Sequence, residues 1–311
     1  MTRHQQIKSE ARVTLIVLTI ILGAFLLTLS GCSFKRITRS KDIVYQPAGK
    51  SIPEQQLSIF APKKKKKPHD VIIFVHGGNW NSGKKSQYNI IGNHWAKKGV
   101  VYVIIDYPLS PLAKYDEMAE STARSVKWVK ENIAQYGGNP ERIFLSGHSA
   151  GGHLAALVSI DDQYFQNLGI ENPVAGIILI DAAGLDMYGY LMDEKFPPGN
   201  TYLNTFTNNP GTWKKATPLY HLHKNMPPMI IYRGGRSYPS IMTSNEKFIK
   251  ALQQYAPGTP YHIQEKKKHI PMITQFFNPW NGRYGEIVEW MGGVGIKKPL
   301  REGVRDAAIG N

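Results

Sequence analysis

Short apolar runs rich in β-branched residues alternate with longer amphipathic stretches along most of the chain. Apolar residues recur at spacings of three and four over residues 119–133, and similar helical patterns occupy 150–159 and 244–255. The strand-like runs are 56–60, 71–76, 100–106, 142–146, 175–180 and 229–233. Strands alternating with helices predict the α/β class, with a mostly parallel sheet and helices on both faces.

Local signals add boundaries to this pattern. Asp116 is expected to cap the helix at 119–133, and Gly137-Gly138-Asn139-Pro140 is expected to end it. Two prolines around a run of five lysines, residues 62–68, separate the first two strands and are typical of a hairpin loop. No repeat and no internal linker divides the body, so a single folded domain is predicted.

The N-terminal segment has the pattern of a secretory signal, with basic residues before an apolar run at 13–29. Leu29-Ser30-Gly31-Cys32 resembles the bacterial lipobox, which implies cleavage before Cys32 and a lipid on its thiol. Ser33 then implies the periplasmic face of the outer membrane of a Gram-negative cell. An uncleaved anchor or an ordinary signal with a chance cysteine is the alternative.

Charge and cysteine content narrow the possible classes. The chain has 38 Lys and Arg against 23 Asp and Glu, a formal +15, which favours anionic surroundings such as lipid, nucleic acid or charged glycans. Charge alone supports a nucleic-acid partner, and export argues against one. Cys32 is the single cysteine, which excludes an intrachain disulfide and a zinc module. His221 and His223 have no third ligand nearby in sequence, so no metal site is expected there. No motif implies a cofactor either.

The clearest chemical motif is Gly147-His148-Ser149-Ala150-Gly151-Gly152. A strand is predicted before it and a helix after it, which is the setting of a nucleophile elbow that exposes the hydroxyl of Ser149. The start of that helix would direct backbone N–H groups at an oxyanion. The alternative is a glycine-rich turn that serves packing or phosphate binding.

A second glycine motif, His76-Gly77-Gly78-Asn79-Trp80, follows an earlier strand. Adjacent glycines let backbone N–H groups come close to a ligand. An oxyanion hole is therefore expected from Ala150, after the nucleophile, and from Gly78 or its neighbours Gly77 and Asn79. His76 is expected to fix this loop and not to transfer protons.

These motifs resemble the α/β-hydrolase superfamily, in particular its esterases and formamidases with an HGG-x-W loop and a GHSAGG elbow. The resemblance covers about 70–277. Asp106-Tyr107-Pro108-Leu109-Ser110-Pro111 is similar to the N-Y-R-L-x-P segment of that family, with Asp and Pro in place of Asn and Arg. The resemblance implies the α/β-hydrolase fold, and acyl transfer by a serine with a histidine base and an orienting acid.

The lipobox resemblance, the hydrolase resemblance and the local composition together predict a division of the chain. Residues 1–31 are expected to be the lipoprotein signal peptide and 32–50 a membrane tether. The α/β-hydrolase domain is expected to span 51–291, and a basic C-terminal tail to span 292–311.

His269 is the expected base, because it follows Ser149 in the family's chain order of serine, acid, histidine. The family places its acid after the strand at 229–232, but no carboxylate lies between 233 and 245. Asp181, at the end of the preceding strand, is the first choice, and Asp186 the second. Glu246 from the following helix, or a dyad with Ser237 or water orienting the histidine, remains open, as does a catalytically impaired protein.

The expected function is a serine carboxylesterase that hydrolyses short-chain or aryl small-molecule esters, with deacetylation of envelope glycans as one candidate activity. Aromatic residues within 186–217 are expected to form a lid or an acyl pocket, and the lysines at 266–268 to attract anionic substrates toward His269. The alternatives are an amidase or formamidase on the same site, and a non-catalytic binding lipoprotein on a hydrolase scaffold.

Overall fold

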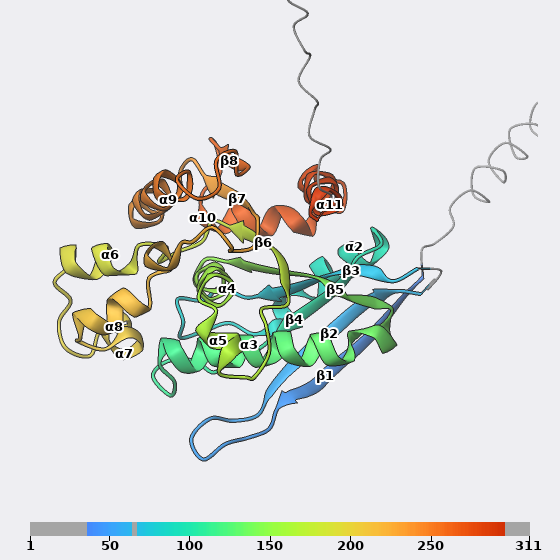
Figure 1. Ribbon diagram of the computed structural model, residues 1–311, viewed down its shortest axis with the longest axis horizontal. Helices are drawn as coiled ribbons and strands as arrows, with labels where there is room; N and C mark the ends of the chain where they lie inside the picture. Colours follow the sequence, from blue (N-terminus) through green and yellow to red (C-terminus); the bar gives the residue numbers. More distant parts are fainter. Residues whose placement is uncertain (1–35, 64–66, 296–311) are drawn as a thin grey trace, which may run out of the picture. The chain divides into compact units, whose positions relative to one another are not determined.

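The computed structural model describes residues 36–63 and 67–295 and has an eight-stranded sheet at its centre within them (Figure 1). The strand order is β1-β2-β4-β3-β5-β6-β7-β8. β2 pairs antiparallel with β1 and β4, and the remaining pairs are parallel. The α/β class and the mostly parallel sheet are therefore confirmed. The strands are β1 (Ile37–Gln46), β2 (Gln55–Pro62), β3 (His69–Val75), β4 (Val101–Ile105), β5 (Gly138–His148), β6 (Val174–Ile180), β7 (Met229–Gly234) and β8 (Tyr261–Gln264).

Alternate residues of the central strands enter two different apolar cores, one on each face of the sheet. In β3, Val71, Ile73 and Val75 face one core, whereas Ile72 and Phe74 face the other. The first core is completed by α3 (Tyr115–Asn132), α4 (Ala150–Ile160) and α9 (Pro239–Leu252). The second is completed by α2 (Asn89–Lys97), α10 (His269–Thr274) and α11 (Arg283–Gly293). Strands buried on both faces explain the continuous apolar runs in the sequence.

Three short helices come between β6 and β7 in the sequence, and they lie close to one another at the left of Figure 1. They are α6 (Met187–Asp193), α7 (Thr201–Phe206) and α8 (Pro210–Lys215), and α5 (Gln163–Gln166) precedes β6. Side chains of Asp186, Asn200 and Asn209 cap the starts of α6, α7 and α8 by accepting backbone N–H groups. The short 3₁₀ helices are η1 (Lys85–Tyr88), η2 (Ile133–Tyr136), η3 (Pro218–His221) and η4 (Gln275–Phe277).

The predicted domain boundaries need correction at both ends. Residues 37–46, assigned from the sequence to a tether, form the edge strand β1 and pair with β2. Most β1 side chains are exposed or half-buried, which is why the polar sequence of this strand looked like a tether. At the other end α11 continues to Gly293, and the carbonyl of Val294 accepts a hydrogen bond from Arg142 Nη1 at 3.0 Å. The folded domain thus spans at least 37–294, whereas the signal peptide and Cys32 lie outside the described residues.

Two local predictions were also wrong. β2 and β3 do not form a hairpin, because β4 lies between them and pairs with both. After β3 the chain passes through α2 and returns as β4, which lies parallel to β3. Strand β4 then occupies the position beside β2 that a hairpin would require β3 to occupy. The helix at 119–133 is not capped by Asp116: α3 begins at Tyr115, and Glu117 Oε2 accepts the N–H of Lys114 at 2.8 Å.

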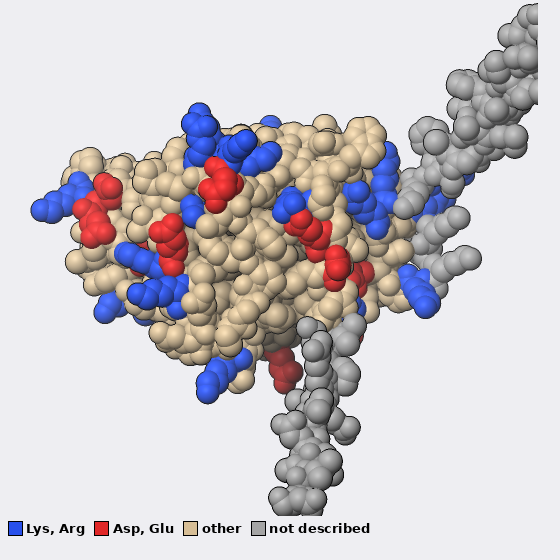
Figure 2. Space-filling model, turned by 90° about the horizontal axis from the view of Figure 1, so that it is seen from above, with Lys and Arg blue, Asp and Glu red and all other residues tan. Residues whose placement is uncertain are grey.

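Surface charge is mixed where it can be seen. On the face in Figure 2, Lys and Arg lie in several separate groups, some beside Asp or Glu, and do not form one continuous basic surface. No helix in the described part of the chain is both long enough and apolar enough to span a bilayer.

Candidate active site

Ser149 lies at the sharp turn between β5 and α4. Its backbone has φ 56° and ψ −124°, a strained conformation for a residue with a side chain. The turn depends on glycine: a Cβ on Gly151 would lie 2.1 Å from the Val75 carbonyl oxygen, and one on Gly147 would lie 2.2 Å from that of Gly151. The small residues of the motif therefore let β5, α4 and the end of β3 come close enough to lift the hydroxyl above the sheet.

The structure brings Ser149, His269 and Asp181 together in one hydrogen-bond chain. His269 Nε2 lies 2.8 Å from Ser149 Oγ, and His269 Nδ1 lies 2.6 Å from Asp181 Oδ2. His269 is the first residue of α10, and Asp181 directly follows β6. Asp181 is fully buried and His269 is 7% exposed. Residues far apart in sequence thus form the geometry of a serine, histidine and aspartate triad.

Asp181 is held by donors from the loop where the acid of related hydrolases would be expected. Its Oδ1 accepts the backbone N–H of Gly234 at 2.7 Å, and its Oδ2 accepts the hydroxyl of Ser237. With His269 this makes three donors on two oxygens, an arrangement suited to an ionised carboxylate, which only accepts. The loop after β7 therefore supplies donors to the acid instead of the acid itself.

The other acid candidates are engaged elsewhere. Asp186 caps α6 through Gly189 and its Oδ2 lies 2.8 Å from Lys247 Nζ. Glu246 is mostly exposed and lies 3.4 Å from Arg233. Ser237 contacts Asp181, not His269, so the dyad that it was proposed to support is absent from the structure.

The loop at residues 77–83, here called the oxyanion loop, follows β3 and packs against the elbow. A Cβ on Gly77 would lie only 3.1 Å from the Ser149 Cβ. Gly78, Asn79 and Trp80 all have positive φ, and the carbonyl of Gly78 closes the turn by accepting the N–H of Ser82 at 3.0 Å. The loop thus lies directly beside the nucleophile.

Two parts of the site carry backbone donors for an oxyanion. Ala150 is the first residue of α4, where an N–H has no partner within the helix. Gly77, Gly78 and Asn79 of the oxyanion loop line the same cavity as Ser149 and are the second set of candidate donors.

His148, which directly precedes Ser149 in the elbow motif, contacts the base directly. Its ring stacks on that of His269, and its Nε2 lies 3.2 Å from the His269 carbonyl oxygen. Burial, followed by the nearby His269, lowers the pKa of His148 to about 3, so its ring is neutral. Nothing local signals this role, because the two histidines are 121 positions apart.

A cavity of about 960 Å³ opens above Ser149 and His269. On one side it is lined by aromatic and apolar residues of the α6–α9 region, and on the other by Ile270, Ile273 and Phe277. Its charged lining residues are Asp186 and Glu194. No lysine or arginine of the described residues lines it, so the lysines at 266–268 are not positioned to bind a substrate within it.

Some aromatic residues of the segment 186–217 line the cavity, and others pack in the core. Tyr190 and Tyr202 line the cavity. Phe206 is instead fully buried, with its ring 5.1 Å from that of Trp80. The short helices therefore form part of the wall of the cavity and are themselves anchored on the oxyanion loop.

The two spaced histidines do not form a metal site. His221 Nε2 and His223 Nε2 contact the carbonyl oxygens of Lys215 and Ile160, respectively. Within 36–63 and 67–295, no group of three or more His, Cys, Asp or Glu residues is arranged to hold a metal ion.

Comparison with known proteins gives consistent results. The BD-FAE family model matches residues 57–241. The chain is 29% identical over 249 residues to the esterase LipQ of Mycobacterium tuberculosis, covering 74% of this chain and 56% of that protein. It is 26% identical over 257 residues to a probable isoprenylcysteine alpha-carbonyl methylesterase of Arabidopsis thaliana, covering 76% and 52%. The chain thus spans about half the length of these curated relatives.

Solved structures share the fold. Esterase B from Lactobacillus rhamnosis matches with a TM-score of 0.67 and 15% identity, covering 89% of this chain and 96% of that one. Esterase 2 of Thermogutta terrifontis matches with a TM-score of 0.66 and 21% identity, covering 86% and 96%. The fold of this chain is that of the α/β-hydrolases.

Proposed function

Since the chain belongs to the BD-FAE family, we propose that it is a serine carboxylic ester hydrolase that acts on small-molecule esters. The observation that carries this proposal is the continuous hydrogen-bond chain from Ser149 through His269 to Asp181, at the base of an open cavity. The esterase names of the curated relatives support the same reaction class.

The geometry suits a two-step reaction through an acyl-enzyme. Ser149 Oγ attacks the ester carbonyl carbon while His269 Nε2 takes its proton, and the N–H groups of Ala150 and the oxyanion loop stabilise the oxyanion. The imidazolium then gives its proton to the leaving alcohol. Water, activated by the same nitrogen, attacks the acyl-enzyme and releases the acid and the free serine. Asp181 holds the proton of His269 on Nδ1 and stabilises the imidazolium.

The cavity lining favours an uncharged substrate with aromatic or short apolar groups. Tyr190, Tyr202 and Tyr238 offer ring faces and hydroxyls, whereas Ile270 and Phe277 are apolar. The exposed carboxylate of Glu194 disfavours an anionic substrate at the same wall. Short acyl and aryl esters fit this lining, and acetylated envelope glycans are a narrower candidate.

The anchoring predicted from the sequence belongs to the same proposal. The lipobox-like Leu29-Ser30-Gly31-Cys32 supports a lipid on Cys32 and a position at the periplasmic face of the outer membrane. Incorporation of labelled palmitate into the wild type and not into Cys32→Ser, with fractionation of the two membranes, tests both parts.

Labelling with a fluorophosphonate probe tests the reaction class. The wild type and the surface control Ser86→Ala should label and hydrolyse p-nitrophenyl acetate, whereas Ser149→Ala should do neither. If no variant labels or hydrolyses any ester, the non-catalytic binding lipoprotein gains support. Faster turnover of N-formyl anilides than of matched esters would favour the amidase or formamidase alternative.

A further inference from the structure

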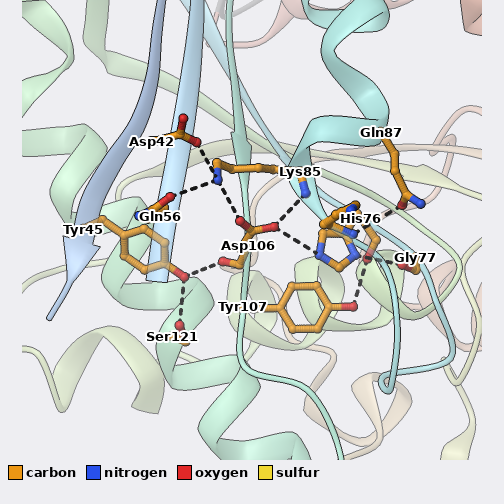
Figure 3. Close-up of polar contacts among 11 residues, drawn as sticks. Asp42, Tyr45, Gln56, His76, Gly77, Lys85, Gln87, Asp106, Tyr107 and Ser121 are labelled. Atoms are coloured by element: carbon orange, nitrogen blue, oxygen red, sulfur yellow. Dashed lines mark hydrogen bonds and ion pairs between the residues drawn. The ribbon is translucent and has the colours of Figure 1, made fainter. Parts of the chain in front are cut away.

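A largely buried lysine lies just downstream of the oxyanion loop, at the start of η1. Only 10% of the Lys85 side chain is exposed. Its Nζ lies 2.9 Å from Asp106 Oδ2, 3.0 Å from Asp42 Oδ1 and 3.2 Å from Gln56 Oε1 (Figure 3). Burial alone would lower the pKa of Lys85, but hydrogen bonds to Asp106 and Asp42 raise it, so the ammonium is retained. The proposed triad reaction makes no use of this charge cluster.

Asp106 holds the downstream end of the oxyanion loop at two points. One carboxylate oxygen accepts the backbone N–H of Lys85 at 2.7 Å, while the other contacts Nζ of the same residue. Asp106 follows β4 in the sheet and is therefore fixed to the core. The chain that leaves the oxyanion loop is thus tied by backbone and side chain to one rigid position.

The residues after Asp106 hold the rest of the same loop. The hydroxyl of Tyr107 donates to the His76 carbonyl at 3.0 Å, and the two rings stack with centroids 4.5 Å apart. The N–H of Ser110 donates to the Trp80 carbonyl at 2.9 Å. The segment 106–110 therefore contacts the chain at three places: His76 before the oxyanion loop, Trp80 within it and Lys85 after it.

The edge strand β1 completes the cluster from the opposite side. Its pairing with β2 is irregular between Ser40 and Ile43, and Asp42 there has φ 57°. This irregularity lets Asp42 reach Lys85 from an edge strand. Three residues further on, Tyr45 donates its hydroxyl to the Asp106 carbonyl at 2.6 Å (Figure 3). Strand β1 thus contacts both members of the Lys85 and Asp106 ion pair.

We propose that Lys85, Asp106 and Asp42 are positioning residues that set the oxyanion loop against Ser149, and that β1 thereby supports catalysis. The inference rests on the proposed function, since it concerns the oxyanion hole of that reaction. Donors to an oxyanion act only when they are held in place before the charge develops, and small displacements cost large factors in rate. Loosening the loop weakens the stabilisation of the transition state, whereas the substrate contacts offered by the other walls of the cavity, such as Tyr190, Tyr202 and Phe277, remain in place.

Steady-state kinetics on a neutral p-nitrophenyl ester tests the proposal. Lys85→Met and Asp106→Asn should lower kcat about 10- to 100-fold with KM within about threefold, which is less than the loss of a whole oxyanion donor. Asp42→Asn should lower kcat several-fold. The double variant Asp42→Asn with Lys85→Met should be no worse than Lys85→Met alone, because both act through the same ammonium. Lys85→Arg should restore part of the rate.

Matched controls separate positioning from general damage. Lys84→Met changes the neighbouring exposed lysine, and Arg39→Ala removes a β1 side chain that contacts Asn93 on α2. Both should leave kcat unchanged. The Asp42 side chain is 67% exposed, so Asp42→Asn should fold. If Lys85→Met fails to fold, the kcat of Asp42→Asn still tests the positioning role.

Three outcomes overturn the proposal: an unchanged kcat in folded Asp42→Asn, a rise in KM at constant kcat, or independent effects of Asp42 and Lys85 in the double variant. These differ from failure of the proposed function, in which the wild type itself neither hydrolyses esters nor labels at Ser149.

Discussion

His148 and His269 lie face to face, with ring centroids 4.6 Å apart and planes inclined by 27°. The neutral ring of His148 also directs Nε2 at the His269 carbonyl oxygen at 3.2 Å, so it contacts both the ring and the backbone of the base. Gly77 makes this possible, because a Cβ there would lie 3.1 Å from His148 Nδ1. A neutral aromatic face next to a base that becomes cationic during the reaction stabilises that cation.

Substitution of His148 should therefore act chiefly through the base, which it contacts by both ring and backbone. His148→Phe keeps the ring face but loses the N–H donor, and kcat should fall about 10-fold with little change in KM. His148→Asp places a carboxylate beside the imidazolium, so the acidic limb of the pH–rate profile should move to higher pH. Profiles of kcat and kcat/KM against pH check both. Identical profiles for the wild type and His148→Asp would show that His148 serves packing alone.

Among the acid candidates, Asp181 should have the largest effect on kcat when it is replaced. Asp181→Asn keeps the size of the side chain but favours the wrong tautomer of His269, and kcat should fall by about 10⁴. Ser237→Ala removes one of three donors to Asp181 and should cost about 10-fold. Glu246→Gln should have no effect, because the mostly exposed Glu246 contacts Arg233 and not His269. A large loss with Glu246→Gln and a small one with Asp181→Asn would reverse the assignment.

The buried His153 should make the fold sensitive to acid. Its Nδ1 accepts the indole N–H of Trp80 at 3.2 Å, and its Nε2 donates to the Ala216 carbonyl at 2.7 Å, so only the neutral ring fits both partners. Burial lowers its pKa to about 4. The unfolded chain, with a pKa of about 6.5, binds the proton first. The stabilisation is thus complete above pH 6.5 and is lost as the pH falls toward 4, by about 3 kcal/mol in total.

Urea unfolding at pH 7.5 and 4.5 measures this loss. His153→Gln can make the same two hydrogen bonds without titrating, so its free energy of unfolding should fall about 2 kcal/mol less between the two pH values than that of the wild type. An equal fall in both proteins would mean that other groups, such as His148, account for the acid sensitivity.

The elbow glycines should be intolerant of any side chain. Gly151→Ala would place a Cβ against the Val75 backbone, and loss of folding or of several kcal/mol of stability is expected. Gly285, within α11, has open space around a built Cβ, so Gly285→Ala should raise stability by up to about 1 kcal/mol. Thermal melts of the two variants compare the same chemical change at a crowded and an open position.

Ser149 and the alternation of strands and helices could be predicted because short contiguous patterns encode them, and His269 because it follows Ser149 in the chain order of the resembling family. The glycines around Ser149 reflect one close contact between neighbouring elements, and buried strands require unbroken apolar runs. Asp181 could be proposed only as one of several acids. The choice among them depends on which strand end faces His269, a property of the folded sheet.

The features that were missed or misassigned depend on distant partners. β1 was assigned to a tether because an edge strand exposes many polar side chains, and its pairing with β2 is not visible in its own composition. The supposed hairpin failed because β4, later in the sequence, takes the place beside β2. His148 and Lys85 gain their roles only from residues that the fold brings beside them.

The placement of the acid at Asp181 has an evolutionary consequence. The segment after β7 no longer has to deliver a carboxylate, and needs only a backbone N–H at Gly234 and a hydroxyl at Ser237. Tyr238, Pro239 and Ile241, which come next, line the cavity. Selection can therefore reshape this stretch for new substrates while the proton-handling groups stay intact, which makes it the first place to diversify in a library aimed at altered specificity.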